Sequence, residues 1–75
     1  MIETIRQIMA QVFQVDSAII SDHVTQKEIE KWDSLRHLNL MIALEEKFGL
    51  SFEPEEISEL TSMDRITEMI KKKQK

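Results

Sequence analysis

The chain of 75 residues contains no cysteine. Neither a disulfide framework nor a metal site with thiolate ligands is therefore possible. The two histidines, His23 and His37, lie fourteen residues apart, which is not the spacing of a helical ligand pair. We therefore expect no metal site.

Glycine, proline and aromatic residues are also scarce, with one Gly, one Pro, one Trp, three Phe and no Tyr. This composition, rich in Leu, Ile, Met, Glu and Lys, favours helix over strand. A chain of this length forms one domain, residues 1–75, with a thin core. It has no room for a deep catalytic cleft with supporting layers, so we expect that the protein is not an enzyme.

Long hydrophobic runs are missing as well. No stretch approaches the length of a membrane span, and the N-terminus lacks the charged-then-apolar pattern of a signal peptide. We therefore expect no membrane span and a cytoplasmic location.

Positive charge is concentrated at the C-terminus. The formal net charge is −4, but Lys71, Lys72, Lys73 and Lys75 lie in the last five residues, and the rest of the chain carries −8. Such an acidic body repels nucleic acid and would steer the protein toward a basic partner. A plainer alternative is that the acidic residues are solvated helix faces and that the lysines stabilise a helix C-terminus.

The spacing of apolar residues predicts an all-α fold, a small four-helix bundle with three longer helices and one short helix. The first helix spans about residues 3–15, and the second runs from Asp33 or Ser34 to about Phe48, before Gly49. Pro54 opens the short helix and Ser62 caps the last one. Between the first two helices lies a long loop, in which scattered apolar residues indicate that it is pinned against the helices.

The second helix has more apolar surface than a surface helix needs, with an arc of roughly 220° at 100° per residue. One interpretation is a central helix that is buried on most sides. The other is that Leu40, Leu44 and Phe48 face the core. In that case Leu35, Leu38 and Ile42 would meet a partner protein or a bound apolar cargo.

The tripeptide Asp33-Ser34-Leu35 begins this helix, which ends in Ala-Leu-Glu-Glu-Lys-Phe at 43–48. In this context the chain resembles the acyl carrier protein and peptidyl carrier family over essentially its whole length. The resemblance implies that a phosphopantetheinyl transferase attaches 4′-phosphopantetheine from coenzyme A to Ser34, and that acyl cargo then rides as a thioester. Asp33 would assist the transferase by binding its metal or a basic residue, or would cap the helix. The alternative for Ser34 is an ordinary N-cap without chemistry.

The resemblance also implies acyl-loading and acyl-transfer enzymes as partners of a monomeric carrier. The residues we expect to meet partners lie on the second helix: Leu35, Arg36, Leu38, Asn39, Ile42, Glu45 and Glu46. Fatty-acid carriers often have acidic residues just after the Ser-Leu pair, whereas this chain has Arg36, His37 and Asn39. That departure indicates a carrier dedicated to a specialised biosynthetic pathway.

Two alternatives remain at this point. The protein could carry aminoacyl or peptidyl groups instead of acyl groups, since the sequence separates these poorly. It could also be an unmodified helical adaptor that docks through Leu35, Leu38 and Ile42.

Overall fold

The computed structural model describes residues 1–74. Within them the chain forms four α-helices and no strand: α1 (Ile2–Phe13), α2 (Ser34–Phe48), α3 (Pro54–Glu59) and α4 (Met63–Lys73). Two 3-10 turns, Ser17–Ile19 and Gln26–Glu28, interrupt the long loop. The prediction of three longer helices and one short helix is confirmed. Lys75, the last of the C-terminal lysines, lies outside the described residues.

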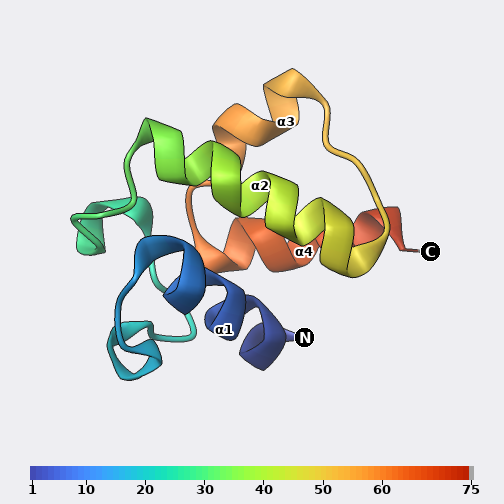
Figure 1. The fold of residues 1–75 in the computed structure, drawn as a ribbon. Helices are drawn as coiled ribbons and strands as arrows, with labels where there is room; N and C mark the ends of the chain where they lie inside the picture. The colour runs from blue at the N-terminus through green and yellow to red at the C-terminus, as the bar shows by residue number, and fades with distance from the viewer. Residues whose placement is uncertain (75) are drawn as a thin grey trace.

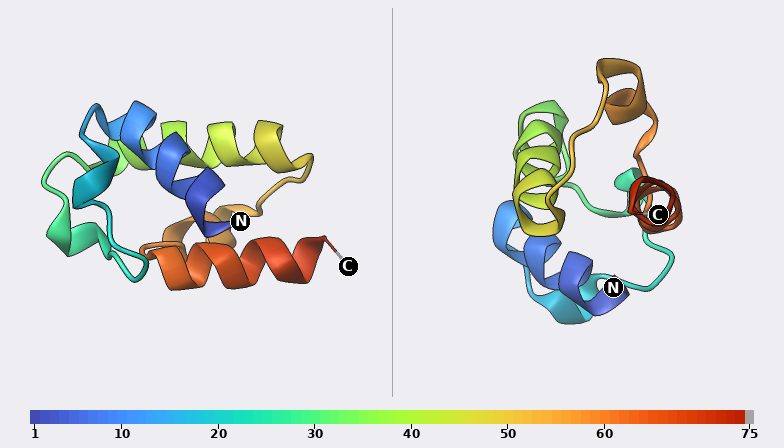
Figure 2. Two further views of the ribbon diagram at one scale, coloured as in Figure 1. Left: turned by 90° about the horizontal axis from the view of Figure 1, so that it is seen from below. Right: turned by 90° about the vertical axis from the view of Figure 1, so that its right-hand side faces the viewer.

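Figure 1 shows the short α3 above α2, with α4 and α1 below it. Viewed down α4, α1 and α2 lie on one side and α4 on the other, with α3 above the gap between α2 and α4 (Figure 2). The three longer helices supply most of the core: Ile5, Met9 and Phe13 of α1, Leu40, Met41 and Leu44 of α2, and Met63, Ile66 and Ile70 of α4. Helix α3 contacts this core through the half-buried Ile57 and is followed by the buried Leu60 at its C-cap.

The ends of the longer helices follow from local chemistry. Gly49 ends α2 in the left-handed conformation at φ 64°, as glycine at this position favours. Gln14 takes the same conformation at φ 57° and ends α1 at Phe13, so α1 stops two residues before the predicted limit. The side chain of Ser62 accepts a hydrogen bond from the Arg65 N–H at 3.2 Å, which confirms the predicted cap of α4.

The long loop is held firmly against the helices, as its apolar residues predicted. Ile20, Val24, Ile29 and Trp32 are all buried. Backbone hydrogen bonds join the loop to the start of α4, from the N–H of Met63 to the Val24 carbonyl at 2.8 Å and through the neighbouring Gln26 and Thr61 at 2.9 Å. The loop therefore arrives at α2 along a defined path.

Among residues 1–74, no helix is both long enough and apolar enough to cross a membrane.

Candidate functional site

Ser34 is the first residue of α2, and it is exposed. The residue before it, Asp33, has an extended backbone and is the N-cap. Its carboxylate Oδ1 accepts a hydrogen bond from the Arg36 N–H at 2.9 Å. The alternative of Ser34 as the N-cap is therefore wrong, because Asp33 occupies that position and leaves the Ser34 hydroxyl at the surface.

Beside Ser34, the carboxylate of Asp33 and the guanidinium of Arg36 form an ion pair. The second oxygen of Asp33, Oδ2, accepts a hydrogen bond from Nη1 of Arg36 at 2.8 Å. The hydrogen bond from the Arg36 N–H, together with the nearby guanidinium, lowers the pKa of Asp33 below its usual value. Asp33 is thus ionised at neutral pH, and Arg36 is directed toward it.

A buried polar bridge lies one turn into α2. The indole N–H of Trp32 donates to Nδ1 of His37 at 2.9 Å. Because the indole can only donate, Nδ1 must accept, and the ring proton lies on Nε2. That nitrogen donates to the carbonyl oxygen of Ile57 in α3 at 2.7 Å. The Trp32–His37–Ile57 bridge therefore connects the loop before Ser34, the first turns of α2, and α3.

The bridge was not predicted from the sequence. His37 is 9% exposed and lies on the core side of the helix. Trp32 is 2% exposed and packs against Phe13, with ring centroids 5.1 Å apart. The available signal was Trp32 itself, since a buried indole N–H needs a hydrogen-bond partner.

The outward face of α2 carries an apolar stripe of Leu35, Leu38 and Ile42, which are 68%, 50% and 55% exposed. Leu40 and Leu44 are fully buried on the opposite side, and Phe48 is half-buried. The surplus of apolar surface on α2 therefore belongs to two separate faces.

The polar residues that we expected to meet partners differ in their exposure. Asn39 and Glu46 are exposed beside the stripe, and Arg36 is half-buried against Asp33. Glu45 is half-buried, and its carboxylate accepts a hydrogen bond from the Phe52 N–H at 2.8 Å. The Glu45 carboxylate thus holds the connection between α2 and α3.

The remaining titratable groups do not form a metal site. Within residues 1–74, no three His, Asp or Glu side chains are grouped so that they could hold a metal ion. His23 instead pairs with Asp64 at 2.9 Å, and this hydrogen bond raises the pKa of His23.

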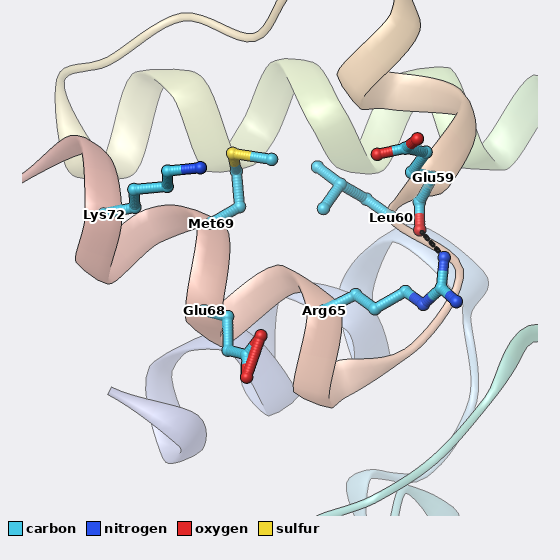
Figure 3. A pocket seen from close by; sticks show the side chains of 6 residues that line it. All are labelled: Glu59, Leu60, Arg65, Glu68, Met69 and Lys72. Atoms are coloured by element: carbon cyan, nitrogen blue, oxygen red, sulfur yellow. Dashed lines mark hydrogen bonds between the residues drawn. The ribbon is translucent and has the colours of Figure 1, made fainter.

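A surface cleft of about 220 Å³ lies between α3 and α4 (Figure 3). Leu60 and Met69 form its apolar part, and the side chains around them are charged: Glu59, Arg65, Glu68 and Lys72. Arg65 Nη1 donates to the carbonyl oxygen of Glu59 at 3.2 Å and joins the two walls. All of these residues lie between positions 59 and 72, so α2 contributes none of the lining.

Comparison with known families gives the decisive observation. Residues 3–70 match the family model described as the phosphopantetheine attachment site. The chain belongs to the phosphopantetheine-binding carrier family. Proteins of this family are non-catalytic carriers that bind 4′-phosphopantetheine covalently. The predicted family, cofactor and non-enzymatic role of this carrier are thereby confirmed, and its transferase and biosynthetic-enzyme partners follow in general terms. A search of curated proteins found no match.

The start of α2 has the chemistry that this group requires. A phosphodiester needs a hydroxyl nucleophile that is open to another enzyme, and the exposed Ser34 provides one. The first turn of a helix offers backbone N–H groups and the positive end of the helix dipole to a phosphate. Arg36 offsets the negative charge of Asp33, so the carboxylate is less of an obstacle to a second anion nearby.

Proposed function

We propose that this protein is a cytoplasmic acyl carrier that holds its cargo as a thioester on a 4′-phosphopantetheine arm attached to Ser34. The observation that carries the assignment is the exposed hydroxyl of Ser34 at the first position of α2, inside the matched residues 3–70. The capping of α2 by Asp33 supports the assignment of Ser34, because the Ser34 hydroxyl is then not needed as the helix cap.

In the attachment reaction, Ser34 Oγ attacks the phosphorus that bears the pantetheine unit of coenzyme A. A phosphoanhydride bond breaks, adenosine bisphosphate leaves, and a base of the transferase takes the serine proton. The ionised Asp33 holds the first turn closed beside Ser34, where it also faces a metal ion or a basic residue of the transferase. When attached, the arm supplies a terminal thiol for thioester formation.

Intact mass measurement after incubation with coenzyme A and a broad-specificity phosphopantetheinyl transferase tests this assignment. We expect a gain of one phosphopantetheine in the wild type and none in Ser34→Ala. Ser51→Ala is the matched control, because Ser51 is also exposed but lies in the connection after α2. A gain that persists in Ser34→Ala, or no gain with several transferases, would contradict the proposal and favour the adaptor alternative.

We further propose that the transferase and the acyl-loading and acyl-transfer enzymes dock on the Leu35, Leu38 and Ile42 stripe. These side chains run along α2 away from Ser34, so an enzyme seated on them has its active site near the serine. Leu38→Asp should slow modification without changing the helix content. Ile19→Asp is the control, because Ile19 is equally exposed on the Ser17–Ile19 turn. Equal effects of the two changes would contradict this docking surface.

The pathway is proposed to be a dedicated one, in which Arg36 limits exchange with fatty-acid enzymes. The acidic body of the chain favours acyl over aminoacyl cargo. Reversing the charge in Arg36→Glu should raise the rate of acceptance by a fatty-acid acyltransferase. Lys47→Glu, which makes the same charge change at the far end of α2, should not. An unchanged rate for Arg36→Glu would contradict the proposal that Arg36 limits this exchange.

A further inference from the structure

His37 is the first buried residue of α2 after Ser34. The two residues are three positions apart on α2, which places them one turn apart and roughly 60° around the helix. The two residues are therefore neighbours on the surface of α2, and His37 is in direct contact with α3 through the Ile57 carbonyl. A chain attached at Ser34 would meet His37 before it reached the core.

The Trp32–His37–Ile57 bridge closes the seam between α2 and α3. The 2.7 Å hydrogen bond from His37 to the Ile57 carbonyl spans the seam. The 2.9 Å bond from Trp32 fixes the His37 ring, and the two rings stack with centroids 6.1 Å apart. Two further contacts hold α3 in place, the 2.9 Å ion pair of Glu56 with Lys73 and the hydrogen bond of Arg65 to the Glu59 carbonyl. Helix α3 is thus held to the bundle by these polar contacts together with the packing of Ile57 and Leu60 on the core.

Behind the bridge the core is closely packed. Leu40, Leu44, Leu60, Met63 and Ile66 are each at most 1% exposed. An alkyl chain entering here would have to part α3 from α2 and leave the His37 Nε2 donor without the Ile57 carbonyl, in apolar surroundings. One buried donor without a partner offsets the burial of roughly one to four methylenes. Short chains therefore gain too little to open the seam.

We propose that this carrier keeps its acyl group outside the helical bundle, because the Trp32–His37–Ile57 bridge closes the seam between α2 and α3. The cargo class that follows is short or polar acyl groups, because a long alkyl chain left in water is unfavourable. His37 is then the residue that determines this specificity. The inference rests on the proposed attachment at Ser34 and adds the class of cargo to it.

For the test, the phosphopantetheinyl transferase attaches octanoyl-phosphopantetheine to the protein. The donor is octanoyl-coenzyme A labelled with ¹³C at its terminal methyl. Intact mass shows whether octanoyl-phosphopantetheine is attached, so a failure of the proposed function is seen before this inference is tested. In the loaded wild type we expect the terminal methyl to keep the chemical shift that it has in free octanoyl-coenzyme A. Nuclear Overhauser contacts from that methyl to Leu40, Leu60 or Ile66 would overturn the proposal.

The matched variants are His37→Leu and Asn39→Leu. His37→Leu removes both hydrogen bonds of the bridge, whereas Asn39→Leu adds the same side chain on the exposed face of α2. We expect contacts between the octanoyl methyl and the core in folded His37→Leu and none in Asn39→Leu. A folded His37→Leu variant that still excludes the chain would overturn the role of the bridge.

A second measurement on the wild type does not depend on how the variants fold. The melting temperature is compared after loading with acetyl, butyryl and octanoyl groups. A chain that is buried in the folded state stabilises that state, and more so as it lengthens. We expect no dependence on chain length, and a melting temperature that rises with chain length would overturn the proposal.

Discussion

Removing both partners of the Trp32–His37 hydrogen bond should cost less than the two single removals added together. Trp32→Phe keeps most of the packing on Phe13 but leaves His37 Nδ1 without its donor, which costs about 1–3 kcal/mol. His37→Leu leaves the buried indole N–H unpaired at a similar cost of about 1–3 kcal/mol. In the double variant neither group is left unpaired. The loss of unfolding free energy in the double variant should therefore be smaller than the sum of the losses in the two single variants, by about 0.5–3 kcal/mol.

Urea denaturation followed by far-ultraviolet circular dichroism measures this coupling. Fluorescence is unsuitable, because Trp32 is the only tryptophan. A domain of 75 residues has a free energy of unfolding of about 4–11 kcal/mol, so the single variants should remain folded. Additivity within about 0.5 kcal/mol would refute the reasoning. Trp32→Phe combined with Leu38→Ala is the control pair, and it should be additive because Leu38 lies on the exposed face of α2.

Three further changes test the fold and its electrostatics. Leu44→Ala removes a fully buried side chain and should lower the free energy of unfolding by about 2–5 kcal/mol in urea; a loss as small as that of an exposed leucine would contradict its place in the core. Gly49→Ala should cost about 1 kcal/mol in the same assay, because φ is 64° there while no atom lies within 4 Å of the added carbon; a neutral result would mean that the left-handed conformation is not kept. Asp64 raises the pKa of His23 above 6.5, so the pair stabilises the fold fully below that pH and loses this effect as pH rises through the raised value. The stability difference between wild type and His23→Gln should therefore be largest in acid and vanish in base, and a difference independent of pH would contradict the pairing.

Local sequence signals were sufficient for the helices. Pro54 at a first helical position, Ser62 as a cap and Gly49 as a left-handed stop act within one turn of chain, so their effect does not depend on the rest of the fold. The end of α1 was placed too late, because Gln14 has no strong preference for the left-handed conformation that it adopts.

The candidate site was partly accessible from the sequence. The motif around Ser34 and the two apolar faces of α2 could be predicted from residue order and helical periodicity alone. Asp33 as the cap could not be separated from Ser34, since both residue types cap helices and only the backbone conformation decides between them.

The sequence by itself determined that this protein is a small helical bundle with an exposed serine motif at the start of its second helix. Only the tertiary structure decided what lies next to that serine. The hydrogen bond from His37 to Ile57 joins residues that are twenty positions apart in the sequence, and Glu45 holds Phe52 across the end of α2. Such pairings depend on how the loop before α2, α2 itself and the segment after it pack together. No local sequence pattern or helix propensity determines which of these residues come into contact.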